Sequence, residues 1–292
     1  MRQPLAAMAL AAAALAWAQC GSVAAQSPAQ PAEKPRRIVS LDLCADQLLV
    51  ELVPRERIAA VTHLLADPAV SAIPEKGRGI PFTRGGAEEV LRHDPDLVLA
   101  GPFGVSGTVG LLRRLGRNMV VVPLANDLDG VRAAVRKVAA AVGERAKGEA
   151  MIADYDRRLA SLARGAERGQ HPTAVIYQVS GAVSGADSLA DAALAAAGLR
   201  NMAADYPLAR SGVVPLEALL ARPPDLLVLS SGADEYRTAV ADNLRHPVIG
   251  LLRKRGASIE LPWRMWLCGT PHIIEAVEQL AAARGRIEAR AR

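Results

Sequence analysis

The stretch Gly143–Gly169, GERAKGEAMIADYDRRLASLARGAERG, decides the fold. Apolar side chains recur at Met151, Tyr155, Leu159 and Leu162, which is the spacing of one helix face, and charged residues fill most other positions. Glycine stands at both ends. The pattern predicts one amphipathic helix of about six turns. Such a segment is too long and too regular for a loop connection.

The segments on either side of this helix repeat one motif. Glu88-Glu-Val-Leu-Arg-His-Asp-Pro-Asp-Leu-Val-Leu-Ala stands before it, and Glu217-Ala-Leu-Leu-Ala-Arg-Pro-Pro-Asp-Leu-Leu-Val-Leu stands after it. In both copies a glutamate opens a short apolar helix, a proline follows seven residues later, and Pro-Asp-Leu leads into an unbroken apolar strand. The repeat predicts two similar lobes, residues 37–142 and 170–292, joined by the helix at 143–169.

Strands alternate with helices in both halves of the chain. This order predicts an α/β fold in which each lobe has a parallel sheet covered by helices on both faces. Residues 63–86, rich in glycine and proline, are expected to form a loop, and the basic segment before Gly256 a turn. Strands are expected at 37–41, 57–62, 96–100, 118–122, 174–179, 225–230 and 257–261, and helices at 47–53, 87–93, 106–116, 127–142, 187–197, 214–221, 236–244 and 271–284.

The N-terminus has the composition of an export signal. Arg2 precedes an apolar run at 6–18, and Val23-Ala-Ala forms a small-residue cleavage site, so residues 1–25 are predicted to be a signal peptide. The apolar run is too short to span a membrane. Lipidation at Cys20 is the alternative, although Gln19 stands where a small residue is wanted. Residues 26–36, with three prolines, are expected to be a flexible spacer.

Ligands of parallel sheets bind where the strands end at their carboxyl edge, so the loops at these ends are the candidate site. Only 3% of the residues are aromatic, yet two tryptophans share the loop at 262–269. They suggest a surface for a flat or bulky ligand, although one of them could instead anchor the core beneath the last helix. The candidate ligand-binding residues are Asp42, Cys44, Phe82, Arg84, Phe103, Ser180, Trp263, Trp266 and Cys268.

Cys44 and Cys268 are the two cysteines left after cleavage, one in each lobe. They could form a disulfide that holds the lobes together, line a cleft between the lobes as free thiols, or pack in the interior without a chemical role. His272 could join Cys268 in a soft-metal site. Lone histidines are more often structural, however, so no protein-bound metal or other resident cofactor is expected.

Signals for catalysis are weak. Gly181-Ala-Val-Ser-Gly differs from the nucleophile elbow because its serine stands one place late. A phosphate loop and a dinucleotide fingerprint are absent from the sequence. No Lys/Arg cluster is interleaved with aromatics, so nucleic acid is not an expected partner. Cys44 with a histidine could form a nucleophile pair, so an exported cysteine-dependent hydrolase is one possible function, and a metal-binding enzyme is another.

These features together resemble periplasmic binding proteins of ABC importers, in the class that handles cobalamin, ferric siderophores and haem. The resemblance rests on the export signal, Arg37-Ile-Val-Ser-Leu, the twice-used Glu-x6-Pro-Asp-Leu and the single long helix, and it covers residues 37–285. It implies a monomeric receptor in the periplasm, without enzyme activity, that holds its ligand between two lobes. It also implies that Glu88 and Glu217 dock onto arginines of the permease. The turn after the first strand and the segment before the last helix would face the ligand.

Departures from the family pattern narrow the expected ligand. The first lobe contains no tyrosine, so a tyrosine-ligated haem is not expected, and arginines near the cleft are few for an anionic ferric catecholate. A large, nearly neutral metal chelate, a corrinoid or a hydroxamate siderophore, suits the tryptophan-containing cleft better. A cleft open enough for such a ligand should hold the cysteine Cα atoms farther apart than the ~7 Å of a disulfide. We therefore expect both thiols to be free and to contact the ligand or its metal.

Overall fold

The structure is a computed structural model that describes residues 33–103, 106–166, 171–206, 208, 211–230 and 242–291. The chain divides into two compact units, Met1–Glu33 and Lys34–Arg292, and the description below concerns the second. The predicted signal peptide and most of the predicted spacer lie outside the described residues. Among the described residues, no helix is long and apolar enough to cross a membrane.

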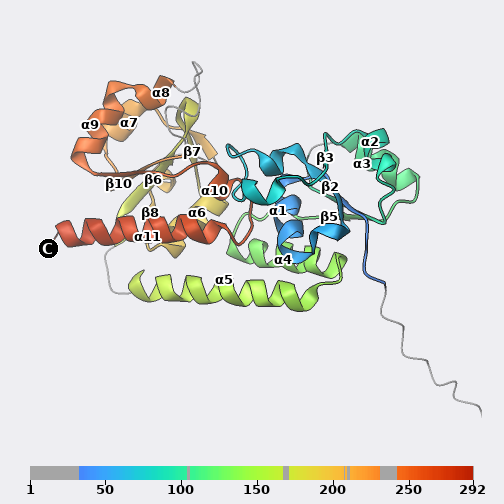
Figure 1. Cartoon of the computed structure of the whole chain (residues 1–292). Coiled ribbons are helices and arrows are strands. Elements are labelled where there is room, and N and C mark those ends of the chain that lie inside the picture. The colour runs from blue at the N-terminus through green and yellow to red at the C-terminus, as the bar shows by residue number, and fades with distance from the viewer. Residues whose placement is uncertain are drawn as a thin grey trace, which may run out of the picture. The chain divides into compact units, whose positions relative to one another are not determined.

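The N-terminal lobe is built on a parallel sheet in the order β3-β2-β1-β4-β5 (Figure 1). Its central strands are short runs of apolar residues buried on both faces, as β4 shows with four buried residues in a row. The predicted loop at 63–86 contains a strand, because residues 82–83 pair with the end of β2. The strands are β1 Ile38–Ser40, β2 Ile58–Thr62, β3 Phe82–Thr83, β4 Leu97–Ala100 and β5 Met119–Val121.

Helices cover this sheet and begin where the sequence supplies caps. The side chain of Asp42 accepts a hydrogen bond from the backbone N–H of Ala45 at the start of α1, and Asp127 accepts one from Gly130 at the start of α4. Pro54 follows the C-cap of α1, Val53. The helices are α1 Leu43–Leu52, α2 Ala87–Arg92, α3 Ser106–Arg114 and α4 Leu128–Ala141, with 3-10 turns at Arg55–Arg57, His63–Ala66 and Pro74–Gly77.

The C-terminal lobe has a sheet in the order β11-β10-β6-β7-β9, with β8 beside β6. The predicted parallel sheet is present in β11, β10, β6 and β8, and one strand departs from it, because β7 pairs antiparallel with both β6 and β9. Ser180 (φ 60°) and Gly181 (φ 77°) reverse the chain directly after β6, so a hairpin replaces the expected strand-to-helix loop. The strands are β6 Thr173–Tyr177, β7 Ala182–Ser184, β8 Arg200–Asn201, β9 Ser211–Val213, β10 Leu226–Leu229 and β11 Ala257–Glu260.

One segment predicted as a turn in this lobe is a helix. Pro247 opens α9, His246 caps it, and three basic residues occupy its last turn, where cations favour the helix dipole. The helix predicted at 236–244 falls mostly outside the described residues. The helices are α6 Leu189–Ala196, α7 Leu216–Ala221, α8 Asp242–Arg245, α9 Pro247–Arg255, α10 Arg264–Leu267 and α11 Ile273–Arg290, with 3-10 turns at Val179–Gly181 and Met202–Asp205.

Helix α5, Arg145–Ala166, occupies the stretch predicted at 143–169. It packs against α4 and α11 (Figure 1). Arg158 on α5 donates two hydrogen bonds to Glu278 on α11, at 2.9 and 2.8 Å. Ile152 belongs to the core around the first sheet, while Tyr155 belongs to the core around the second. One helix therefore contributes to both cores.

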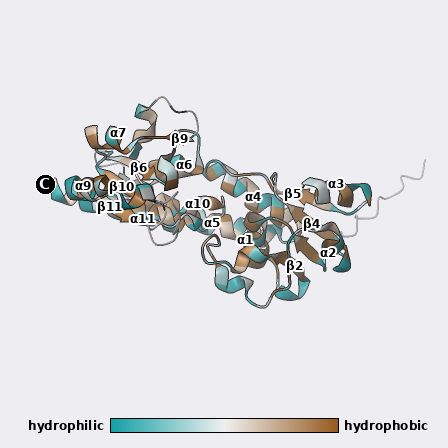
Figure 2. Cartoon of the chain, turned by 90° about the horizontal axis from the view of Figure 1, so that it is seen from above, coloured by the Kyte–Doolittle hydropathy of each residue, from teal (hydrophilic) through white to brown (hydrophobic). Residues whose placement is uncertain are grey.

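The two copies of the sequence repeat adopt the same local structure. In each, a six-residue helix, α2 or α7, precedes a fully buried strand, β4 or β10. Each of these strands lies between two others in its sheet. In Figure 2 the strands of the first sheet are coloured mainly as hydrophobic.

Candidate functional site

The carboxyl edge of the first sheet carries a carboxylate in a confined position. Asp42 follows β1 and caps α1, and burial raises the pKa of its side chain. Gly101 follows β4 beside it, where an added Cβ would lie 2.1 Å from the Asp42 Oδ2. Glycine at position 101 is therefore required for Asp42 to lie across the end of β4.

The two phenylalanines of the chain are both exposed at this edge. Phe82 lies on β3, level with the carboxyl end of β2, and its side chain is 52% exposed. Phe103 lies three residues beyond β4 and is 75% exposed. Large apolar side chains that face solvent together at a sheet edge are typical of a binding surface.

The segment that carries Phe82 is held against α2. The Thr83 hydroxyl and the backbone N–H of Arg84 both donate to Glu89 Oε2, each at 2.9 Å. The hydrogen bond from the Arg84 backbone, followed by that from Thr83, lowers the pKa of Glu89. The Arg84 guanidinium lies 5.6 Å from the centre of the Phe82 ring. Phe82 and Arg84 thus form one unit with an apolar and a cationic part.

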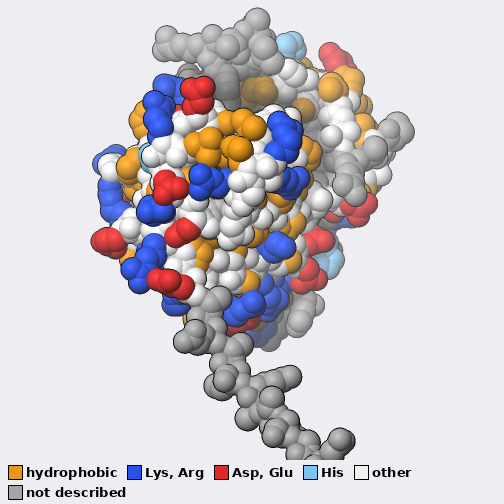
Figure 3. Space-filling model, turned by 90° about the vertical axis from the view of Figure 1, so that its right-hand side faces the viewer, with side chains coloured by type: hydrophobic (Ala, Val, Ile, Leu, Met, Phe, Trp, Pro, Cys, Tyr) orange, Lys and Arg blue, Asp and Glu red, His pale blue; other side chains and the backbone are white. Residues whose placement is uncertain are grey.

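Leu124 belongs to the same edge and was missed by the sequence analysis. It lies three residues beyond β5 and is exposed. The rule that placed Phe103 also applies to it, because both are large apolar residues just after a parallel strand. Figure 3 shows the outer face of this lobe, where hydrophobic side chains lie among acidic and basic ones.

Among the described residues of the second lobe, two of the predicted site residues lie just beyond strands. Ser180 is exposed in the left-handed turn after β6, and its N–H donates to the Asn243 Oδ1 at 3.1 Å. Trp263, three residues beyond β11, is half-buried. Both residues lie at the carboxyl ends of strands, as predicted.

Trp266 occupies the core and not the surface. Its side chain is 8% exposed, belongs to the core around the second sheet, and donates through Nε1 to the buried Ser230 Oγ at 3.0 Å. The polar end of the indole is therefore satisfied inside the lobe. Trp266 therefore fits the alternative prediction of a core anchor beneath the last helix. Its burial does not favour a direct contact with ligand.

The expectation of two free thiols is wrong. Cys44 and Cys268 form a disulfide with their Cα atoms 5.1 Å apart. The reason is that the segment before α11 packs directly on α1, where Cys268 is buried in the core around the first sheet. A paired Cys44 cannot serve as a thiolate nucleophile, and a paired Cys268 cannot serve as a thiolate metal ligand.

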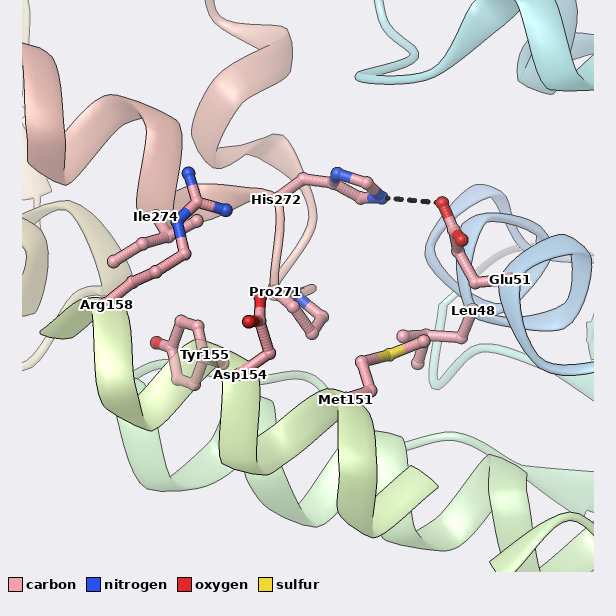
Figure 4. A pocket seen from close by; sticks show the side chains of 9 residues that line it. All are labelled: Leu48, Glu51, Met151, Asp154, Tyr155, Arg158, Pro271, His272 and Ile274. Atoms are coloured by element: carbon pink, nitrogen blue, oxygen red, sulfur yellow. Dashed lines mark ion pairs between the residues drawn. The ribbon is translucent and has the colours of Figure 1, made fainter. Parts of the chain in front are cut away.

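His272 forms an ion-pair contact and not a metal site. Its Nε2 lies 3.4 Å from the Glu51 Oε1 (Figure 4). The same carboxylate oxygen accepts a hydrogen bond from Lys76 Nζ at 2.6 Å. These contacts, the one with His272 first, lower the pKa of Glu51 to about 2. Among the residues that the structure describes, no group of three His, Cys, Asp or Glu side chains could hold a metal ion.

A cavity of about 160 Å³ adjoins this ion pair. It lies beside the C-terminal half of α1, whereas Asp42 lies at the N-terminal end of the same helix. It is therefore separate from the candidate ligand surface. Its lining residues are Leu48, Glu51, Met151, Asp154, Tyr155, Arg158, Pro271, His272 and Ile274 (Figure 4).

Glu88 and Glu217 are both exposed, in the first turns of α2 and α7. A carboxylate at this position is favoured by the helix dipole. Because α2 and α7 precede equivalent central strands, the two carboxylates occupy corresponding places in the two lobes.

Comparison with known proteins finds matches to binding proteins. A family model described as periplasmic binding protein matches residues 38–251. The cobalamin-binding protein of Halobacterium salinarum is 29% identical over 208 residues, which cover 69% of this chain and 55% of that protein. The chain thus spans just over half the length of the curated relatives it matches.

Solved structures share the fold. The periplasmic heme-binding protein RhuT from Roseiflexus sp. RS-1 is 24% identical, with a TM-score of 0.71 over 87% of this chain and 99% of that one. The periplasmic vitamin B12-binding protein BtuF of Vibrio cholerae is 18% identical, with a TM-score of 0.67 over 87% and 98% of the two chains. These likenesses concern the fold, and the family model covers most of the sequence. The chain belongs to the periplasmic binding protein family.

Proposed function

We propose that this protein is a periplasmic receptor that delivers a bulky, nearly neutral metal chelate to an ABC importer. The observation that carries the proposal is the exposure of Phe82 and Phe103 at the carboxyl edge of the first sheet. A soluble protein gains nothing in stability from such exposed rings, whereas a large apolar ligand would cover them.

The chemistry of this edge favours a corrinoid or a ferric hydroxamate over an anionic chelate. Phe82, Phe103 and Leu124 supply apolar surface, and Arg84 supplies one cation beside Phe82. The cobalamin-binding relative and the fold shared with a vitamin B12-binding protein support the first class. A structure titled as an Fe³⁺-hydroxamate transport system, from Saccharomonospora viridis, shares the fold at a TM-score of 0.62 and supports the second.

We further propose that residues 37–142 and 170–292 act as the two lobes and that helix 143–169 joins them. The contribution of α5 to both cores supports this division. Helix α4 also enters both cores, because Val131 lies in the second core and Val135 in the first. The ligand would lie between Asp42, Phe82, Arg84 and Phe103 on one lobe and Ser180 and Trp263 on the other.

The permease would be met by one carboxylate from each lobe. Glu88 and Glu217 are exposed, occupy corresponding positions, and have no role in the cores. A receptor that presents one equivalent carboxylate on each lobe fits a partner with two similar halves. The alternative of a cysteine-dependent hydrolase loses its nucleophile, because Cys44 is in a disulfide.

The test is a titration of intrinsic tryptophan fluorescence with cyanocobalamin, a ferric hydroxamate and haem. Trp263 lies within the proposed site, so its emission should respond to ligand. We expect one of the first two chelates to bind with a dissociation constant below about 10 µM, near −7 kcal/mol. Binding of haem alone would instead assign the protein to a different ligand class.

A further inference from the structure

One face of α1 is joined at three successive points to the segment that precedes α11. Cys44 is bonded to Cys268. The Thr270 hydroxyl donates to Gln47 Oε1 at 3.3 Å. His272 Nε2 lies 3.4 Å from Glu51 Oε1 (Figure 4). We call these six residues the seam.

The spacing of the seam follows the geometry of a helix. Positions 44, 47 and 51 are three and four residues apart, so their side chains leave α1 on one face. Their partners are alternate residues, 268, 270 and 272. The contacts therefore run in register along the helix, which distinguishes the seam from three unrelated contacts.

The segment is also fixed from its other side. An added Cβ at Gly269 would lie 2.3 Å from the Cβ of Ala125, in the connection that leads to α4. Gln47 and Thr270 are buried. The segment is thus packed between α1 and the residues before α4, which restricts its movement along α1.

The seam differs between its two ends. The end at Cys44 is covalent and lies two residues from Asp42, at the ligand-facing edge of the first sheet. The end at Glu51 is held by the single non-covalent contact with His272, at 3.4 Å, and borders the cavity beside α5. Relative motion of the lobes is therefore most restricted next to the proposed ligand and least restricted near the cavity.

We propose that the seam holds the two lobes at one fixed spacing, and that Cys44 and Cys268 are thereby positioning residues for ligand release. The first half concerns the protein alone, and the second rests on the proposed function. A receptor built this way admits its ligand into a preset space instead of closing around it. Lengthening of the spacing should speed dissociation of the ligand.

The spacing is measured by pulsed electron paramagnetic resonance between labels on non-canonical ketone residues at Leu115 and Leu251, which are exposed on different lobes. We expect a narrow distance distribution in the oxidised protein and a broader or longer one in the Cys44→Ser/Cys268→Ser variant. The matched control is Arg136→Gln/Glu149→Gln, which removes an exposed ion pair between α4 and α5 and should leave the distribution unchanged. Identical distributions with and without the disulfide would overturn the proposal.

Two further measurements keep the result interpretable. If the serine variant does not fold, the disulfide of the folded wild-type protein is reduced with a phosphine and the distance distribution is measured again. The variant Glu51→Gln/His272→Gln, with the disulfide intact, should broaden the distance distribution less than loss of the disulfide does. Dissociation of cyanocobalamin and of a ferric hydroxamate is then followed by stopped flow, where loss of the disulfide should raise the rate at least about fivefold. An unchanged rate together with a changed spacing would overturn the positioning role. If neither chelate binds the wild-type protein, the proposed function fails while the distances still decide the fixed spacing.

Discussion

Asp46, in the first turn of α1, is the most unusual single residue of the N-terminal lobe. Its carboxyl group is fully buried, and Oδ2 accepts hydrogen bonds from the backbone N–H and the hydroxyl of Thr62. Oδ1 is buried with no partner among the described residues. Burial is the main reason that the pKa of Asp46 rises to about 7.

The raised pKa predicts how stability depends on pH. The folded state holds the Asp46 proton more tightly than the unfolded state, whose pKa is near 3.8, so this group's stabilising contribution is full below pH 4 and is lost as the pH rises towards 7. A shift of this size corresponds to about 4 kcal/mol in total. Asp46→Asn mimics the protonated form and should remove the dependence.

Urea unfolding at pH 5 and pH 8 measures this effect. Relative to Asp46→Asn, the wild-type protein should lose about 2–3 kcal/mol between the two pH values. Asp129→Asn, at a side chain that is 92% exposed, is the control and should follow the wild type. Parallel pH profiles for the wild type and Asp46→Asn would contradict an ionisable buried Asp46.

Trp266 gives a second prediction at this scale. Because its ring fills the core around the second sheet, Trp266→Ala should cost about 3–5 kcal/mol and lower the melting temperature by roughly 10 °C. Trp266→Phe should lose about 1 kcal/mol, the contribution of the hydrogen bond to Ser230. Thermal unfolding followed by circular dichroism tests both, with the half-buried Trp263→Ala as comparison. A melting temperature unchanged in Trp266→Ala would contradict the core role of Trp266 and favour a contact with ligand instead.

Single residues also show where sequence reasoning stops. The exposure of Phe103 followed from its place after β4, since the carboxyl edge of a parallel sheet is a property of topology, whereas Phe82 lies on a short strand that was predicted as a loop. The burial of Trp266 did not, because it depends on Ser230, 36 residues away in the chain. The pairing of Cys44 with Cys268 depends on the packing of segments 224 residues apart, which no local pattern encodes.

At the scale of elements, long apolar runs were predictive and short turns were not. Strands β4 and β10 were recognisable because both faces are buried and their runs are unbroken. The hairpin after β6 was missed because its Ser-Gly turn has the same composition as a strand-to-helix loop. The difference is the positive φ of Ser180, which the residue type alone does not reveal.

The repeated helices α2 and α7 carry the docking prediction. Glu88→Ala and Glu217→Ala should leave chelate affinity unchanged and reduce transport, each removing an exposed carboxylate worth about 1 kcal/mol. The double variant should transport less than either single one. Uptake by proteoliposomes that contain the permease measures this, with exposed Glu75→Ala as the control outside the repeat. Normal transport by the double variant would reject both docking sites.

At the scale of the whole molecule, the two cores are linked by more than one helix. Both α4 and α5 enter both cores, and the disulfide adds a covalent link that closes a loop of 224 residues. In a chain-entropy view, a link across so long a loop stabilises the fold by about 5 kcal/mol. The lobes are therefore coupled in stability, so unfolding should occur as one cooperative transition.

The central claim is that the apolar carboxyl edge of the first sheet binds a bulky metal chelate. Isothermal titration calorimetry with cyanocobalamin and a ferric hydroxamate tests it directly on the wild type, on Phe82→Ala/Phe103→Ala, and on Leu251→Ala as an exposed apolar control on the other lobe. We predict that one chelate binds the wild type and the control equally, and that the double variant binds at least about tenfold more weakly, since each lost aromatic contact is worth about 1–3 kcal/mol. Equal affinity in all three proteins, or no heat with either chelate, would contradict the account.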